Sequence, residues 1–357
     1  VGSNALQNNT AAQSTAVGSA ALQNNSSGTQ STAVGYKALN AISTNGSCTA
    51  MGYQALTVNT AASNSAFGSQ ALATCTTGTL NTGIGVGSLQ DVGSGTNNTG
   101  IGHRAGSGTN GSQNTSVGTF ALGNGGNAGS DCTAVGYKAA GACTVANTTA
   151  IGSGALLLNT SSTQNTAVGY QAGAAQVAAG GSCTFVGYNA GLLSIAASNT
   201  AIGSASGGYT NTGFNTSVGA LSLASTAGGS CVGIGYNAGA ACTASQITAG
   251  GAGAWQGLTT STQRTACGSA AAKNIVAAGS NCTFVGFRSG YQLNTAQNTA
   301  VGAMALNSTG AGADNTALGY NALLLNTAAN ITAVGSQALA ANTTGTGNTA
   351  LGYSALN

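Results

Sequence analysis

The chain repeats one short pattern of polar, apolar and glycine positions from end to end. In each copy a Thr, a small residue and an aliphatic residue precede a glycine, as in "NTAVGYQAG" at 165–173. From Gly2 to Gly352 these glycines, called anchor glycines below, are separated by 16, 17 or 18 residues. Helical repeats need about 33 residues and propeller blades about 40, so this unit is too short for either. The spacing predicts an all-β chain, a parallel β-solenoid of about 21 coils over residues 1–357.

The three positions before each anchor glycine predict a short strand. The first is Thr in 19 of 21 coils, and the third is Val, Ile, Leu, Met or Phe in 19 of 21. These two positions share one face because side chains alternate along a strand, and such residues suit a half-buried pleated surface. We therefore expect Thr and the aliphatic residue to face the core, with Cys267 in the aliphatic column. The middle residue is small except at Phe185 and Phe284, which predicts a flat outer face open to close approach by another surface.

A second short segment follows each anchor glycine, which is expected to form the bend. Its second position holds four of the six basic residues, so it is expected to face water. Strict alternation would also turn the Leu two residues later outward, as at Leu39, unless a bulge intervenes, and both orientations stay open. Its first position is aromatic in nine coils, at Tyr36, Tyr53, Tyr137, Tyr170, Tyr188, Tyr236, Phe287, Tyr320 and Tyr353.

Composition favours a structural role. Charged residues make up 3% of the chain, against about 25% in an ordinary soluble domain. Proline, which cannot donate to a β-ladder, is absent. Layers spaced by about 4.8 Å would make 21 coils a rod on the order of 100 Å long. Both ends fall within a repeat and no signal peptide is recognisable, so we expect a part of a longer chain.

The sequence offers little for catalysis, metals, nucleic acid or membranes. There is no Glu, the three Asp are far apart, and His103 is the single histidine. Paired carboxylates or a catalytic triad would therefore need distant coils to meet, and we expect no enzyme activity, no cofactor and no metal. A net charge of +3 without clustered Lys or Arg argues against nucleic-acid binding. No stretch predicts membrane insertion of this segment.

A second repeat, several coils long, places cysteines at corresponding positions of its two copies. Residues 132–230 resemble residues 231–329, so that Cys132 and Cys143 recur as Cys231 and Cys242. Each pair lies within one coil and could form a disulfide if the Cα atoms come within about 7 Å. Alternatively these are small buried thiols in a column that is otherwise mostly Asn. Cys183 and Cys282 are expected to remain thiols.

The repeat resembles a known family. The phrase "NTAVGYQAG" is similar to the "SVAIGxxAxA" head repeat of YadA-like trimeric autotransporter adhesins and to the repeats of phage tail-fibre shafts. The resemblance covers essentially the whole chain. It implies a left-handed parallel β-roll, three chains packed side by side, and an extracellular attachment or spacer role.

The physical argument for self-association is separate from that resemblance. A coil of about 17 residues encloses few side chains, so packing of outer faces between copies would supply the missing burial. We expect a homotrimer or filament, against the alternative of a monomer held by its hydrogen-bond ladder.

The functional expectation is an extracellular fibre or adhesin rod on a cell or virion surface. The eight tyrosines named above and Trp255 are candidate contacts for host glycans or proteins, although a structural ladder would show the same period. Ice binding is the alternative from another class, because Thr ladders on flat solenoids organise water. The expected inward orientation of the Thr face argues against it.

Overall fold

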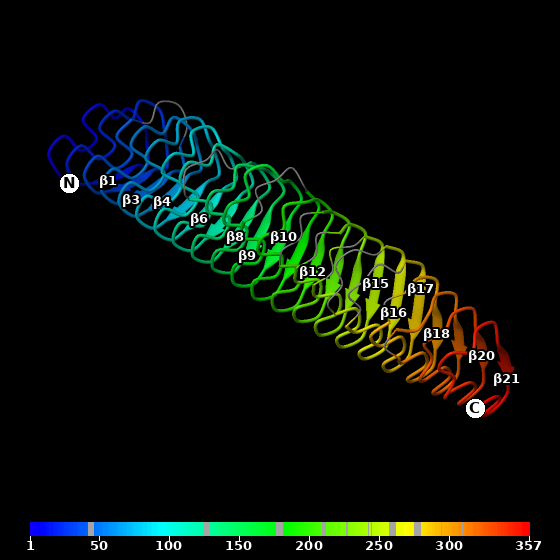
Figure 1. Ribbon diagram of the computed structural model, residues 1–357. Helices are drawn as coiled ribbons and strands as arrows, with labels where there is room; N and C mark the ends of the chain where they lie inside the picture. The colour runs from blue at the N-terminus through cyan, green and yellow to red at the C-terminus, as the bar shows by residue number, and fades with distance from the viewer. Residues whose placement is uncertain are drawn as a thin grey trace. The chain divides into compact units, whose positions relative to one another are not determined.

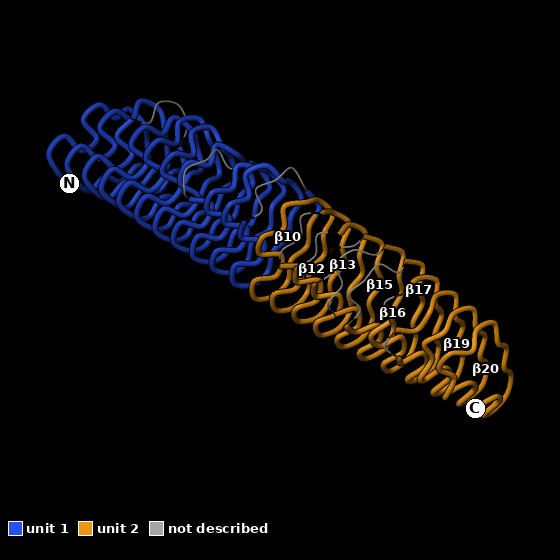
Figure 2. The backbone as a smooth tube through the Cα atoms, viewed as in Figure 1, with its two compact units in different colours: residues 1–182 blue, residues 183–357 orange. Residues whose placement is uncertain are grey.

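The computed structural model describes two compact units of the chain, residues 1–182 and residues 183–357 (Figure 2). Within them it describes all residues except 42–45, 124–128, 176–180, 209–211, 226–227, 242, 244, 257–261, 275–279, 294 and 309. The sequence predicts one continuous repeat region, and both units are built from the same repeat. Each unit is described by itself below.

Both units are built from short parallel strands joined by turns, and the described residues contain no helix (Figure 1). Within each unit the strands end at the residue before an anchor glycine and pair in register with the strand of the next coil, as Thr82 does with Thr99. The predicted parallel β-solenoid is therefore confirmed. The first unit contains β1 (Thr15–Val17), β2 (Thr32–Val34), β3 (Thr49–Met51), β4 (Ser65–Phe67), β5 (Thr82–Ile84), β6 (Thr99–Ile101), β7 (Thr115–Val117), β8 (Thr133–Val135), β9 (Thr149–Ile151) and β10 (Thr166–Val168). The second contains β11 (Thr184–Val186), β12 (Thr200–Ile202), β13 (Thr216–Val218), β14 (Val232–Ile234), β15 (Ile247–Gly250), β16 (Arg264–Cys267), β17 (Cys282–Val285), β18 (Thr299–Val301), β19 (Thr316–Leu318), β20 (Thr332–Val334) and β21 (Thr349–Leu351).

The strands turn their small middle residue inward, so the expectation that Thr and the aliphatic residue face the core is wrong. Ala33 in β2 is fully buried, whereas Val17 in β1 is 45% exposed. The narrow coil explains the orientation. A Cβ on Gly100 would lie 2.8 Å from Leu89 Cγ and 2.8 Å from Ser88 Oγ, so a branched side chain does not fit there. The flat face that the sequence predicted on the outside of the strands lies on the inside. The segment that follows the anchor glycine packs against it.

The second segment is a turn and not a strand. Its alternate residues adopt positive φ, for example 52° at Lys37 and 48° at Leu39. Left-handed residues reverse the side-chain direction, so the period of two does not apply and the Leu points inward. The buried leucines of this column include Leu22, Leu39, Leu56, Leu72, Leu89, Leu156, Leu223, Leu306, Leu323 and Leu339.

In two coils the inward strand residue is Phe instead of a small residue, and the inward turn residue is Gly instead of Leu. Phe185 and Phe284 point inward from β11 and β17 and are fully buried. Gly191 and Gly290 occupy the Leu position of the same coils, where an added Cβ would clash with the phenyl ring. The interior volume of each coil is therefore shared between the strand and the turn, and a large residue on one side requires a small one on the other.

The anchor glycines are required for stacking. Gly85 has φ +128°, and a Cβ there would lie 2.6 Å from the carbonyl oxygen of Gly102 in the next coil. Both the backbone conformation and the contact between coils exclude a side chain.

A ladder of buried Asn side chains connects successive coils. In the column four residues before the anchor glycine, the Oδ1 atom of Asn64 accepts a hydrogen bond from the backbone N–H of Asn81 at 2.9 Å. Asn81 and Asn98 repeat the contact at the same distance, and Asn114 accepts from the backbone of Cys132. In the second unit Asn199, Asn215, Asn298 and Asn315 do the same. This column is one polar part of the core, and each Asn named here satisfies a backbone donor of the next coil.

Candidate interaction surfaces and a surface notch

The outer face of the strands is an uncharged stripe of Thr and aliphatic side chains. We call it the Thr/aliphatic face, and it consists of the first and third residues of the three before each anchor glycine. Neither column contains a Lys, Arg, Asp or Glu. Exposed members of the aliphatic column include Val17, Met51, Phe67, Ile84, Ile101, Ile151, Val168, Ile202, Ile234, Val285, Leu318 and Leu351. Continuous apolar stripes of this kind are typical of interaction surfaces.

The Thr/aliphatic face is also regular. Because the strands pair in register, like side chains recur at the strand spacing of about 4.8 Å, as Ile84 and Ile101 do. Cys267 lies in this face and is exposed, so the expectation of a core position was wrong. The reason is again the inward orientation of the middle residue, here Ala266.

The aromatic column after the anchor glycines also faces outward. Its eight predicted contact residues, Tyr36, Tyr53, Tyr137, Tyr170, Tyr188, Tyr236, Tyr320 and Tyr353, are all exposed. Tyr36 and Tyr53 stack with their ring centroids 5.4 Å apart. Basic side chains lie over neighbouring rings, with Lys37 Nζ 5.3 Å from the Tyr36 centroid and Lys138 Nζ 5.2 Å from that of Tyr137. The column therefore exposes its rings, and adjoining cations cover some of them in part.

Trp255 is not a surface residue. It occupies the inward Leu position of the coil that begins with β15 and is fully buried. Its ring centroid lies 5.7 Å from that of Phe284, two coils on. The intervening coil offers only Ala266 and Ala272 there, which leaves room for the indole.

A buried cation lies close to Trp255. Arg264, in the Asn column of the β16 coil, is 3% exposed and its guanidinium carbon lies 5.1 Å from the Trp255 ring centroid. Burial raises the pKa of the Cys282 thiol in the next coil, and hydrogen bonds and the Arg264 charge oppose the rise. We made no prediction for Arg264 from the sequence, although an Arg in a column of Asn and Cys was a visible signal.

The two cysteines Cys132 and Cys143 face each other inside the β8 coil. Both are buried thiols, and their sulfur atoms lie 3.3 Å and 3.4 Å from the carbonyl oxygen of Val145. The hydrogen bond between the two thiols lowers the pKa of Cys143 to about 7 and raises the pKa of Cys132. The disulfide stays a prediction for this pair. For the other pair, Cys231 is a buried thiol and Cys242 lies outside the described residues.

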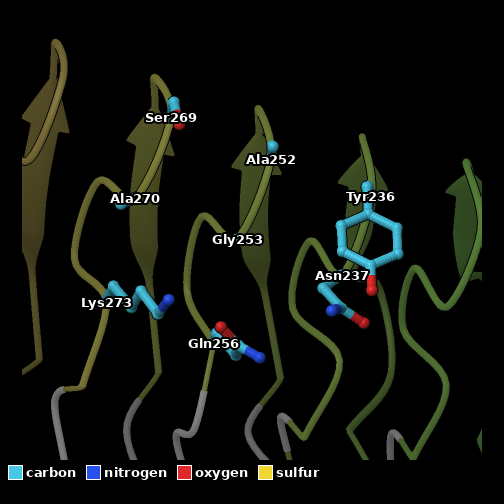
Figure 3. A pocket seen from close by; sticks show the side chains of 8 residues that line it. All are labelled: Tyr236, Asn237, Ala252, Gly253, Gln256, Ser269, Ala270 and Lys273. Atoms are coloured by element: carbon cyan, nitrogen blue, oxygen red, sulfur yellow. The ribbon is translucent and has the colours of Figure 1, made fainter.

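A notch opens in the aromatic column of the second unit (Figure 3). It lies beside Tyr236, where the next two coils carry Ala252 and Ser269 in place of an aromatic residue. The volume is about 290 Å³. The lining residues are Tyr236, Asn237, Ala252, Gly253, Gln256, Ser269, Ala270 and Lys273.

The acidic residues and the histidine are dispersed over the surface. Asp91, Asp131 and Asp314 are exposed on different coils, and the Asp91 carboxylate accepts a hydrogen bond from Thr74 Oγ1 at 3.3 Å. His103 is exposed and packs edge-on to Phe120, with the ring centroids 5.2 Å apart. Among the residues that the structure describes, no three His, Cys, Asp or Glu side chains are grouped to hold a metal ion.

Comparisons with known proteins add no assignment. Neither the protein-family models nor the curated proteins that were searched give a match. In the described part of the chain, no helix has the length and apolar character needed to cross a membrane.

Proposed function

We propose that this chain is a structural segment of an extracellular fibre or adhesin, in which the Thr/aliphatic face packs against the same face of further copies. The observation that carries the proposal is the exposure of that face. It is uncharged, and its aliphatic side chains recur from strand to strand in each unit, with Ile84 at 41% and Ile101 at 39% exposed. Water-exposed methyl groups in this arrangement lose free energy when another surface covers them.

A second copy is the occupant that fits best. The face repeats at the strand spacing, and another copy repeats at the same spacing, so the side chains of two faces can interlock over many coils. The absence of charge from both columns removes electrostatic repulsion between identical faces. The resemblance to trimeric adhesins and phage fibres implies three copies.

A mechanical role agrees with what the coils contain. The interior is occupied by Ala, Leu and the Asn ladder, and the acidic residues lie apart on the surface. We propose extension and surface display on a cell or virion, without catalysis, as the role of the repeat.

Mass measurement on charge variants tests the self-association. Light scattering of the purified chain is expected to give a multiple of 33.6 kDa. Thr99→Lys and Ile101→Lys in β6 are expected to shift the mass toward the monomer, because packing would bury an unpaired charge at a cost of several kcal/mol. Gln70→Lys is the control, since it adds the same charge in the column where Lys37 and Lys138 already occur. A wild-type monomer, or equal effects of all three variants, would contradict the proposal.

Ice binding is a second candidate that the outward orientation now favours. The sequence argued against ice binding because Thr and the aliphatic residue were expected to face the core, and that expectation is wrong. The face instead presents aligned rows of Thr hydroxyl and aliphatic methyl groups to solvent. Faceted ice crystals grown with the wild-type chain, but not with Thr99→Lys, would favour this candidate over self-association.

A further inference from the structure

We propose that the notch beside Tyr236 binds an anionic sugar ring. The proposal goes beyond the structural role above and does not depend on self-association, because the notch lies in the aromatic and turn columns and not in the Thr/aliphatic face.

The notch is a local interruption of the repeat. Its floor consists of two coils whose first two residues after the anchor glycine are small, Ala252 with Gly253 and Ser269 with Ala270. The aromatic column resumes one coil further on, with Phe287. The space between the aromatic side chains is therefore about two coils wide, and no side chain of the column fills it.

An aromatic ring borders the notch at its β14 end. Tyr236 is 57% exposed, and Figure 3 shows its ring in open outline, with an edge toward Ala252 and a face open to solvent. A tyrosine ring offers an apolar face with a polar tip, which suits the C–H face of a pyranose and its flanking hydroxyl groups. The volume of about 290 Å³ lies at the lower limit of ligand pockets, so a single ring is the expected occupant.

Polar side chains from three coils line the notch. Asn237 comes from the first coil, Gln256 from the second and Lys273 from the third. A Cβ added to Gly253 would lie 3.6 Å from Gln256 Oε1 and 3.9 Å from Lys273 Cδ, so these two side chains lie over the glycine. In Figure 3 both extend toward the side where Tyr236 and Asn237 stand. Primary amides present a donor and an acceptor together, which matches neighbouring sugar hydroxyls.

The charge of the notch favours an anion. Lys273 is one of six basic residues in the chain, and none of the eight lining residues is acidic. Arg288 lies in the next coil, over the rings of Phe287 and Tyr291. An ammonium group at the rim attracts a carboxylate or sulfate on the ring, and the open position keeps this contribution modest.

Saturation-transfer NMR with sodium glucuronate, glucose 6-sulfate and glucose tests the proposal on the full chain. We expect binding of glucuronate, the sulfated sugar or both with a Kd on the order of 1 mM, and weaker binding of glucose. The preferred anion shows whether carboxylate or sulfate is the favoured group. Tyr236→Ala is expected to weaken binding about tenfold, and Lys273→Gln two- to fivefold for the anions only.

Filling the notch gives the sharpest variant. Ser269→Tyr restores the aromatic column as it stands in other coils and is expected to abolish binding. Ala303→Tyr makes the same kind of change at the same column position of the β18 coil and should leave binding intact. Ala252→Tyr serves as a second filling variant, and thermal unfolding should show that all of these variants fold.

Three results would overturn the proposal. The first is that neither anion binds. The second is that anion binding survives both Ser269→Tyr and Ala252→Tyr, and the third is that glucose and the anions bind with equal affinity. Failure of self-association leaves these results unaffected, since the NMR measurement works equally on a monomer.

Discussion

At the residue scale, the anchor glycines hold the coils together through close backbone contact. The Cβ that any other residue would add at Gly85 meets the Gly102 carbonyl at 2.6 Å. The anchor position is therefore always Gly for two reasons, the positive φ and the contact between coils. A pair of variants can measure the two effects separately.

Gly85→Ala should lower the free energy of unfolding by about 3 kcal/mol or more, because backbone strain and a clash with the next coil add together. Gly352→Ala is the matched control, since Gly352 has a similar φ of +122° and no atom within 4 Å of the added Cβ. It should cost only the backbone strain, about 1–3 kcal/mol. Denaturant unfolding of both variants checks the difference, and equal losses would refute the contact between coils.

Buried thiols make the fold sensitive to alkaline pH. Burial raises the pKa of Cys75 from 9.0 to about 11. The thiol then stays protonated in the folded state where the unfolded chain has lost the proton. The contribution of the Cys75 thiol to the free energy of unfolding is therefore fully present below pH 9. It is lost as the pH rises through 11, which lowers the free energy of unfolding by about 3 kcal/mol.

The Cys75→Ala variant should show a smaller decline of unfolding free energy between pH 9 and 11 than the wild type. Urea titrations at several pH values measure this slope. The wild type, which keeps Cys75, is the reference in the same titrations. If the Cys75 variant kept the wild-type slope, the raised pKa would be wrong.

At the element scale, each coil has a fixed interior volume that strand and turn divide between them. Most coils pair a small strand residue with Leu, and two pair Phe with Gly. Phe185 and Gly191 form one such exchanged pair. Leu is compatible with the Gly191 backbone, since φ is +59° there and +48° at Leu39.

A double-mutant cycle tests this division of volume. Gly191→Leu alone should lower the free energy of unfolding by about 2 kcal/mol or more through overpacking, and Phe185→Ala alone by about 3–5 kcal/mol through a cavity. The double variant recreates the common pair and should cost less than either single change. Additive losses in chemical denaturation would contradict the shared volume.

Cys132 and Cys143 test whether a coil can be cross-linked from inside. Oxidised glutathione should convert the two thiols to one disulfide, with two reduced glutathione molecules released and two hydrogens lost from the protein. Mass spectrometry of the intact chain and of its peptides measures this. Cys143→Asn should remain uncross-linked, and it mimics the β3 coil, where Asn59 faces Cys48 at 3.3 Å.

Retention of both thiols in the wild type under conditions that oxidise an exposed dithiol would contradict the disulfide prediction. The low pKa of Cys143, about 7, should make oxidation faster as the pH rises through 7, because the thiolate is the attacking species.

The repeat spacing was enough to predict the solenoid and to single out the tyrosine column, because these depend on position along the chain. The direction of the strand residues was predicted wrongly. The pattern of Thr, Ala and Val satisfies either direction, and the outcome depends on how little space the turn leaves, as at Gly100 against Leu89. The notch was not predicted, because it depends on three coils lying side by side. The small residues Ala252 and Ser269 in an otherwise often aromatic column were a visible sign of it.

At the scale of the whole molecule, the outward direction of the Thr/aliphatic face changes the functional argument. An inward face would leave a smooth outer surface of small residues, whereas the observed face exposes apolar side chains such as Val17 and Ile234 along each unit. The account requires another surface to cover them, and we propose further copies of the chain.

Reactivity of Cys267 toward a maleimide tests that claim most directly, because Cys267 lies in the Thr/aliphatic face and is the exposed thiol among the described cysteines. A Cys242→Ser background removes the cysteine outside the described residues. We predict fast labelling of one thiol in dilute protein and at least about tenfold slower labelling at concentrations where the mass exceeds that of one chain. Labelling only after unfolding would contradict the outward face, and an equal rate at every concentration would contradict packing through it.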